Sequence, residues 1–185
     1  MSNILKFKLI IIVSCITLTL SFKYRMNQKH KTFVYWKQIE WNDFKGNQQD
    51  LLIKDNYAAN ISSHIILEED SVLPQKAHAV MYPYKSSKVD KKKTDYLLNH
   101  EQYHFNITEA FARKLNRAIE YDTLASDEKI KVIHQLISHH EKIWQADYDK
   151  ETEHGRNNIM QKYWEYRIDS LLIECENPNY FNEAL

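Results

Sequence analysis

The sequence predicts an α+β fold in which a small antiparallel sheet is followed by three helices. Between residues 33 and 84, short segments alternate apolar and polar residues and are rich in β-branched and aromatic side chains, which is typical of half-buried strands. From residue 95 onward, apolar residues recur every three to four positions, as they do on one face of a helix. Because the strand segments all precede the helical ones, an antiparallel sheet is favoured over a parallel one.

Size and composition fit one globular domain. The chain has 185 residues, of which 43% are hydrophobic and 27% are charged, and we place the folded domain at residues 33–180. The 25 basic residues balance 25 acidic ones, so no excess of positive charge favours a polyanionic partner. Nucleic acid is therefore not expected among the partners.

Three strands are expected before residue 85. Residues 33–44 alternate aromatic or β-branched residues with polar ones and run into Lys45 and Gly46, which favours a strand and a turn. Residues 60–67 and 76–84 are the next two strands, and Pro83 restricts the last one to an edge strand or a strand end. The Lys-rich residues 86–94 are expected to form a polar loop.

Three helices are expected after residue 94. The first begins at residue 95 and has an apolar stripe opposite a polar face. The stripe contains Leu97, His100, His104, Ile107, Phe111, Leu115 and Ala118, and the polar face contains Asn99, Gln102, Asn106, Glu109, Arg113 and Asn116. The second helix covers residues 127–154, with Ser126 or Asp127 as N-cap, and the third covers residues 158–174.

The N-terminal residues have the pattern of a targeting segment. Lys6 and Lys8 precede a nearly unbroken apolar run over residues 9–22, which is the order found in a signal peptide. Residues 1–22 are therefore expected to be a signal peptide or an N-terminal membrane anchor, so that the domain is exported and meets a membrane only through this segment. Its location is then periplasmic, in the cell envelope or secreted. Once residues 1–22 are removed, Cys175 is the one remaining cysteine, which excludes an internal disulfide and a cysteine-rich zinc site.

The sequence His100-Glu101-Gln102-Tyr103-His104 carries the strongest functional signal. Residues four apart in a helix lie one turn above each other, so His100 and His104 can bind one metal ion. A catalytic zinc ion has three protein ligands and a water molecule, and Glu101 is placed to accept that water's proton. The alternative is a pair of core histidines bonded to carbonyl or carboxylate groups, because an unpaired buried imidazole is costly.

The third ligand is expected in residues 148–155, where Gly155 marks a helix end or a close backbone approach. His154 is favoured, with Asp149 orienting an imidazole from outside the ligand set and Glu151 as the alternative ligand. His140 remains a further alternative. Ile107 and Ala110 stand where a metzincin needs glycine and histidine, Glu109 faces away, and Glu120 is a weak candidate.

Three motifs resemble the bacterial family known as domain of unknown function 922, whose members are regarded as secreted zinc-dependent proteases. They are Trp41-Asn42-Asp43-Phe44-Lys45-Gly46, then the segment 98–105 around the histidine pair, then Tyr148-Asp149 with Thr152, His154 and Gly155. The resemblance covers roughly residues 36–166. It implies a small zincin-like domain in which the block from Asp149 to Gly155 completes the metal site. Asn157 and Asn158 stand where the family has a glutamine.

Two functions follow as expectations. The first is an exported zinc-dependent metallopeptidase in which His100, His104 and His154 hold Zn²⁺, Glu101 is the general base, and a strand such as residues 76–84 pairs with an extended peptide or protein substrate. The second is a non-catalytic envelope or peptide-binding module whose structural zinc site is closed by His139 or His140. Tyr148, Tyr163 and Tyr166 are expected either to stabilise an oxyanion or to pack in the core.

Overall fold

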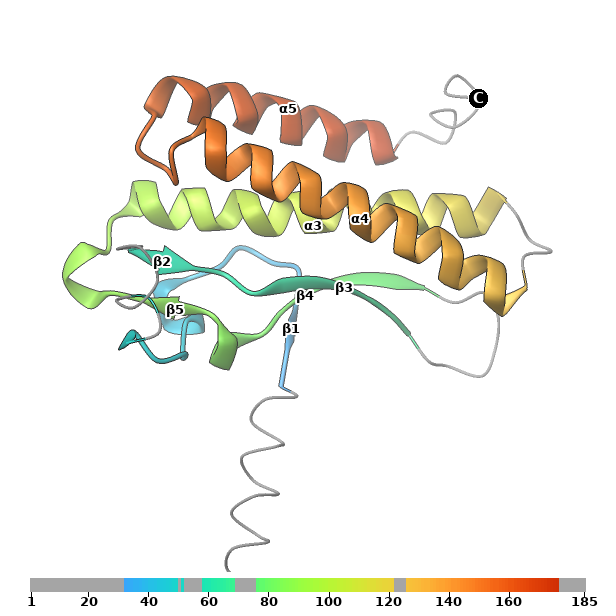
Figure 1. Cartoon of the computed structure of the whole chain (residues 1–185), viewed down its shortest axis with the longest axis horizontal. Helices are drawn as coiled ribbons and strands as arrows, with labels where there is room; N and C mark the ends of the chain where they lie inside the picture. Colours follow the sequence, from blue (N-terminus) through green and yellow to red (C-terminus); the bar gives the residue numbers. More distant parts are fainter. Residues whose placement is uncertain (1–31, 50, 52–57, 69–75, 122–125, 177–185) are drawn as a thin grey trace, which may run out of the picture. The chain divides into compact units, whose positions relative to one another are not determined.

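The computed structural model describes residues 32–49, 51, 58–68, 76–121 and 126–176. From Phe33 onward they belong to the compact unit Phe33–Leu185, in which a sheet layer lies against a layer of helices (Figure 1). The expected signal peptide or anchor, residues 1–22, lies outside the described residues. No helix within the described part of the chain has the length and apolar character needed to span a bilayer.

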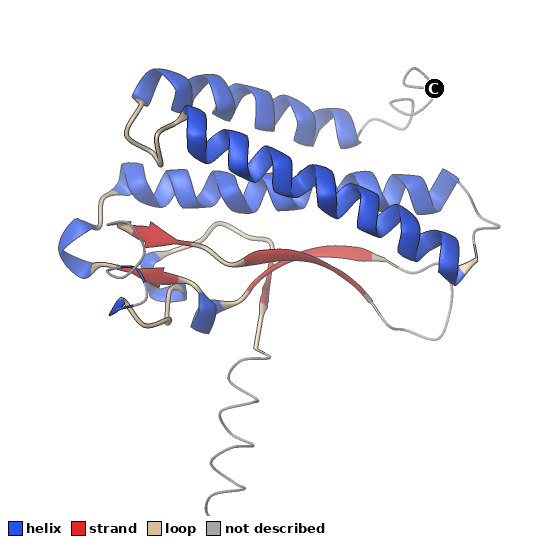
Figure 2. Cartoon of the chain, in the orientation of Figure 1, coloured by secondary structure: helices blue, strands red, loops and turns tan. Residues whose placement is uncertain are grey.

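The sheet layer is antiparallel. Strands β1 (Val34–Tyr35), β4 (Ala77–Met81) and β3 (Ser63–Leu67) form one sheet in the order β1-β4-β3. A second, two-stranded sheet pairs β2 (Ala59–Asn60) with β5 (Ser87–Lys88). The helices α3 (Asp95–Tyr121), α4 (Asp127–Glu151) and α5 (Asn158–Glu176) follow along the chain (Figure 2). This arrangement confirms the predicted α+β fold.

The predicted strands are correct in part. The expected strand over residues 33–44 continues only to Tyr35, and Trp41–Asp43 forms a 3₁₀ helix. There, Asp43 accepts a hydrogen bond from the backbone N–H of Glu40 at 2.9 Å, and such local side-chain bonds compete with strand pairing. The segment 60–67 divides into the end of β2 and β3, and the expected polar loop contains β5 and the 3₁₀ helix Asp90–Lys92.

The position of β4 corrects one expectation. Residues 76–84 were expected at an edge or a strand end, yet β4 pairs with β1 on one side and with β3 on the other. The strand end is the correct alternative, because β4 stops at Met81 and Pro83 begins a 3₁₀ helix, Pro83–Lys85. Proline lacks the N–H that a further ladder bond needs.

Helix α3 lies between the sheet and the pair α4 and α5 (Figure 1), so its polar face is buried or half-buried. Gln102 and Asn106 are 5% and 9% exposed. Their carboxamides hydrogen-bond to the sheet layer: Gln102 Oε1 accepts from Ile39 N at 2.7 Å, and Asn106 Oδ1 accepts from Trp36 Nε1 at 3.0 Å. Polar residues on this face therefore satisfy buried donors instead of meeting water.

Helix α4 begins at a side-chain cap, and its C-terminal turn lies beside α3. Ser126 is the N-cap and its hydroxyl accepts a hydrogen bond from Lys129 N at 3.3 Å, as expected from the sequence. Helix α4 then runs antiparallel to α3, so that its last turn lies beside the first turns of α3 (Figure 1). This places Asp149 next to the two histidines.

Candidate metal centre

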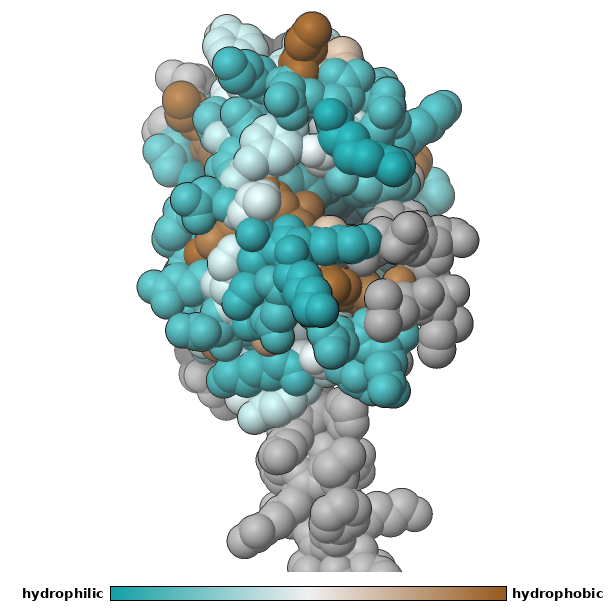
Figure 3. All heavy atoms as spheres, turned by 90° about the vertical axis from the view of Figure 1, so that its left-hand side faces the viewer, coloured by the Kyte–Doolittle hydropathy of each residue, from teal (hydrophilic) through white to brown (hydrophobic). Residues whose placement is uncertain are grey.

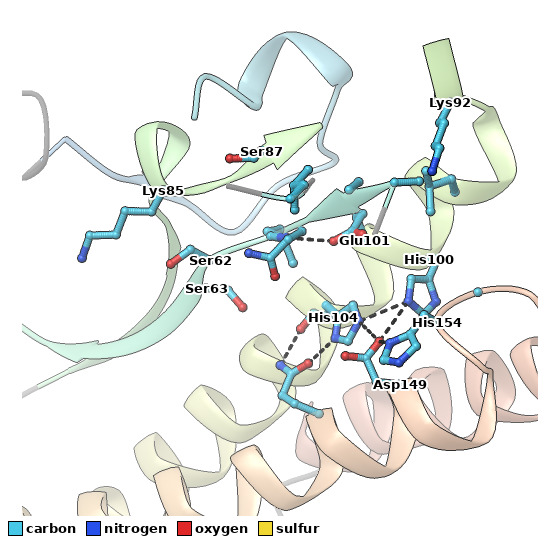
Figure 4. Close-up of a pocket in the computed structure, with 18 of the residues that line it drawn as sticks. Ser62, Ser63, Lys85, Ser87, Lys92, His100, Glu101, His104, Asp149 and His154 are labelled. Carbon is cyan, nitrogen blue, oxygen red and sulfur yellow. Dashed lines mark hydrogen bonds and ion pairs between the residues drawn. The ribbon is translucent and has the colours of Figure 1, made fainter. Parts of the chain in front are cut away.

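Two helices bring three candidate ligands together. His100 and His104 come from α3 and Asp149 from α4, and one ligand atom of each lies within 4.8 Å of the other two. The Nε2 atoms of the two histidines are 3.3 Å apart. Asp149 Oδ1 lies 3.4 Å from Nε2 of His100 and 3.1 Å from Nε2 of His104 (Figure 4).

These distances fit the edges of one coordination polyhedron. With metal–ligand bonds of about 2.0–2.1 Å, two ligands of a tetrahedral zinc ion lie roughly 3.3 Å apart. The three separations between the His100, His104 and Asp149 atoms fall close to this value. The arrangement of the side chains therefore matches a small divalent cation with two imidazole ligands and one carboxylate ligand.

Two glutamines orient the imidazoles. Nδ1 of His100 donates to Gln161 Oε1 at 2.9 Å, and Nδ1 of His104 donates to Gln145 Oε1 at 2.5 Å. The amide orientations are set by their nitrogens: Gln145 Nε2 donates to the carbonyl of His104, and Gln161 Nε2 donates to the Tyr148 hydroxyl. A proton on Nδ1 leaves the Nε2 lone pair for a metal.

Asp149 and His104 form a charge pair in the metal-free protein. Burial alone raises the pKa of Asp149, but hydrogen bonds from His100 and His104 hold it far below its usual range. Burial alone lowers the pKa of His104, but its hydrogen bond to Asp149 and the nearby carboxylates raise it to about 9. A metal ion at this site therefore competes with a proton on His104.

Glu101 lies on the sheet side of the same cavity. It is 3% exposed, and its Oε2 accepts a hydrogen bond from the backbone N–H of Ile61 at 2.8 Å (Figure 4). Burial raises the pKa of Glu101. A buried carboxyl group with a raised pKa beside a candidate metal site has the properties of a general base that works near neutral pH.

Tyr148 packs against the candidate ligand histidines. Its ring stacks on the His100 imidazole with 4.7 Å between centroids, and its hydroxyl donates to the backbone carbonyl of His100 at 3.3 Å. The side chain is fully buried, so core packing is its role. Tyr163 and Tyr166 are exposed on α5 and do not line the cavity.

The remaining candidate ligands occupy different places. His154 Nδ1 lies 3.1 Å from Asp149 Oδ1, although His154 is not a member of the group of three. Glu151 accepts a hydrogen bond from Trp164 Nε1 at 2.7 Å. His139 and His140 are exposed on α4 and do not line the cavity, so the structure brings neither of them to the candidate metal centre.

The turn after α4 has an unusual backbone. His154 N donates to Asp149 O at 2.8 Å and Glu153 N to Lys150 O at 3.3 Å, which is the hydrogen-bond pattern of a Schellman helix end. Glu153, His154 and Gly155 all have positive φ, of 52°, 55° and 74°. Glu153 therefore occupies the position where glycine is usual, and Gly155 follows two residues later.

Gly155 is required by its contact with His100. A Cβ atom on Gly155 would lie 3.0 Å from Cγ of the His100 imidazole and 3.3 Å from Nδ1, which is closer than side-chain atoms normally approach. The close backbone approach expected from the sequence is thus present. The turn packs directly against one candidate ligand.

The candidate metal centre opens into a cleft of 1410 Å³ between the sheet layer and α4. Its walls include residues 58–64 from β2 and β3, the first turns of α3, and the α4 side chains Glu141, Lys142, Gln145 and Asp149. Hydrophilic residues dominate the face of the molecule on the side where α3 begins (Figure 3). The site is therefore accessible to a solute.

Sequence reasoning did not identify the two glutamines. Gln145 precedes Asp149 by one helical turn, so this i, i+4 pair was a usable signal for a shared face. No local pattern pointed to Gln161, because its contact with His100 spans 61 residues of sequence. Asp149 was expected to orient an imidazole, and the structure places its carboxylate next to the imidazoles of both His100 and His104.

Comparison with known protein families yields a match that includes the candidate site. A family model described as "Bacterial protein of unknown function (DUF922)" matches residues 61–155, which contain His100, Glu101, His104 and Asp149. No curated protein and no solved structure matches the chain. Because the matched segment covers just over half of the chain, the protein belongs to the DUF922 family of bacterial proteins.

Proposed function

We propose that the protein is an exported zinc-dependent metallopeptidase. His100, His104 and Asp149 hold the metal, with His154 as the alternative third ligand, and Glu101 is the general base. The observation that carries the proposal is that a buried glutamate with a raised pKa lines the same cleft as a pair of preoriented imidazoles. The apolar run over residues 9–22 supports export.

The nature of the side chains supports zinc. Two imidazoles and one carboxylate are a common ligand set of catalytic zinc, which leaves a fourth position for water. Bound zinc would supply a Lewis acid that polarises a peptide carbonyl and acidifies water. Glu101 then removes the proton of the attacking water and delivers it to the leaving amine.

The strand that would pair with substrate is β3. Strand β4, the segment expected for this role, has both edges occupied by β1 and β3. Within the described residues β3 pairs with β4 alone, and Ser63 and His64 of β3 line the cleft. An extended peptide could therefore add to the outer edge of β3 and pass the metal centre.

The test of this function is Glu101→Gln. The variant is expected to bind stoichiometric zinc like the parent protein and to hydrolyse a peptide library about 10²- to 10⁴-fold more slowly, which is the usual contribution of general base catalysis. Zinc is measured by elemental analysis and cleavage by mass spectrometry. Glu120→Gln, an exposed carboxylate on the same helix, is the matched control and should cleave normally.

Two results would contradict the proposal. The purified protein could lack stoichiometric metal after zinc loading, or Glu101→Gln could retain the parent rate. Either outcome would mean that His100, His104 and Glu101 do not carry out zinc-dependent hydrolysis.

The contact between His154 and Asp149 favours a second candidate function, a non-catalytic peptide-binding or envelope module with structural zinc. A site closed by His100, His104, Asp149 and His154 would have four protein ligands and no open position. A crystal structure of the zinc-bound protein separates the two functions, because a catalytic site keeps a water molecule on the zinc ion, whereas a closed site has four protein ligands and no water.

A further inference from the structure

Positive and negative side chains occupy different depths in the cleft. The carboxylates lie inside: Glu101 and Glu141 are 3% and 7% exposed, and Asp149 is half-buried between the histidines. The cations Lys85, Lys142 and Arg156 also line the cleft, but all three are exposed. The rim is therefore basic although the chain as a whole has a net charge of zero.

The inner carboxylates add little negative potential at the rim. Oδ1 of Asp149 contacts the imidazoles, and Glu141 accepts hydrogen bonds from Thr108 at 3.0 Å and Gln145 at 2.9 Å. Glu101 accepts a hydrogen bond from Ile61 N at 2.8 Å inside the cleft, and burial raises the pKa of Glu141, which favours its neutral form.

The rim cations are not neutralised by neighbouring carboxylates. Among the described residues, Lys85, Lys142 and Arg156 form no ion pair, whereas Lys37, Arg113 and Arg117 elsewhere on the surface do. Lys85 packs over the Tyr82 ring at 4.7 Å, and Arg156 Nε donates to the carbonyl of Glu153 at 2.9 Å. Both contacts orient the side chains and leave their charge uncompensated.

The cations come from both walls of the cleft. Lys85 follows β4 in the sheet layer, and Lys142 is on α4. Burial lowers the pKa of His64 on β3, and the positive charges of both lysines lower it further. They therefore face one region at one end of the cleft. Arg156 follows Gly155, which contacts His100, and Figure 4 shows Lys85 and the His154 turn on opposite sides of His104.

We propose that the cleft selects peptides with acidic side chains on both sides of the bond that faces the metal centre, contacted by Lys85 and Lys142 on one side and Arg156 on the other. This inference rests on the proposed function, because it treats the cleft as the binding site of a peptide substrate. Clefts lined by charge of one sign concentrate ligands of the opposite sign. An acidic peptide fits better than a nucleic acid, because the cations border a recess instead of forming an extended surface stripe.

The experiment measures binding separately from cleavage. Full-length Glu101→Gln protein, loaded with zinc, is titrated into fluorescein-labelled decapeptides that are acidic, neutral or basic but otherwise matched, at low and moderate salt, and fluorescence anisotropy gives Kd. The acidic peptide should bind most tightly. Lys85→Ala/Lys142→Ala in the same background should weaken its binding by about fivefold and reduce the salt dependence.

The control is Lys131→Ala/Lys162→Ala, which removes two exposed lysines outside the cleft and should leave the Kd unchanged. Equal binding of acidic and neutral peptides, or an equal effect of both double variants, overturns the proposal. So does tighter binding of an oligonucleotide of the same charge. If acidic peptides bind selectively but the parent protein cleaves none, the preference stands and the hydrolase function fails.

Discussion

At the scale of single residues, Asp149 is the centre of the candidate site. One of its oxygens contacts His100, His104 and His154 at distances of 3.4, 3.1 and 3.1 Å. The histidine pair was predictable because four-residue spacing on a helix determines its geometry. The roles of Asp149 and His154 were not, because they depend on how the turn after α4 folds, and three residues of positive φ cannot be anticipated from Glu153 and His154.

Alanine substitutions distinguish the two possible third ligands. Asp149→Ala should lower zinc affinity by more than about 100-fold, whereas His154→Ala should stay within the 10- to 100-fold range typical of residues that orient ligands. Competition with a chromophoric chelator measures both affinities. The opposite order would make His154 the ligand and Asp149 the orienting group. Glu151→Ala serves as control, since its carboxylate bonds to Trp164.

The pKa of His104 gives the metal-free protein a defined pH dependence. Because that pKa is raised from 6.5 to about 9 on folding, protonated His104 contributes its full stability below pH 6.5. The contribution falls as pH rises and is lost above about pH 9. Urea unfolding in EDTA between pH 6 and 9.5 should show this decline, and His104→Gln should flatten it. Zinc affinity should rise over the same interval, because fewer protons compete for Nε2.

At the scale of elements, α3 shows how a polar face can serve packing. Asn116 belongs to the predicted polar face and uses its carboxamide to pair with both backbone groups of Ala77, at 2.7 and 2.9 Å. Amides are polar in any hydropathy pattern, so the sequence does not reveal whether they meet water or a strand edge. The helix starts at Asp95, Asp127 and Asn158 were predictable, because capping and periodicity are local properties. The predicted end of the second helix at residue 154 is wrong, because α4 ends at Glu151 and the turn follows.

The turn after α4 offers a matched pair of substitutions. Glu153→Gly places glycine where φ is 52° and should stabilise the protein by about 0.5–1 kcal/mol. Gly155→Ala should destabilise it by about 1–2 kcal/mol through its positive φ, and should also weaken zinc binding because its Cβ displaces the His100 ring. Urea denaturation and zinc titration provide the two readouts. Unchanged zinc affinity in Gly155→Ala would show that the turn does not position His100.

At the scale of the whole molecule, the candidate ligands connect elements that are distant in sequence. His104 and Asp149 are 45 residues apart, and the glutamines that orient the histidines come from α4 and α5. A metal bound here therefore stabilises the packing of all three helices as well as the site.

Zinc should accordingly raise the melting temperature. At a free concentration about 100 times Kd, binding to the folded state alone adds about 2.7 kcal/mol, which for a domain of this size corresponds to roughly 5–10 °C. Differential scanning calorimetry with zinc and with EDTA measures the difference. His100→Ala should abolish it, and an equal shift in that variant would indicate binding elsewhere.

The separation of the candidate ligands along the chain also sets an order of events. His100 and His104 are made before α4 exists, and a growing or translocating chain that has only α3 offers an ion two imidazoles and no carboxylate from α4. The complete ligand set appears once α4 has returned along α3 and Gly155 has docked on His100. The candidate metal site is therefore completed late in maturation, and chains that stall before the helices assemble lack the full ligand set.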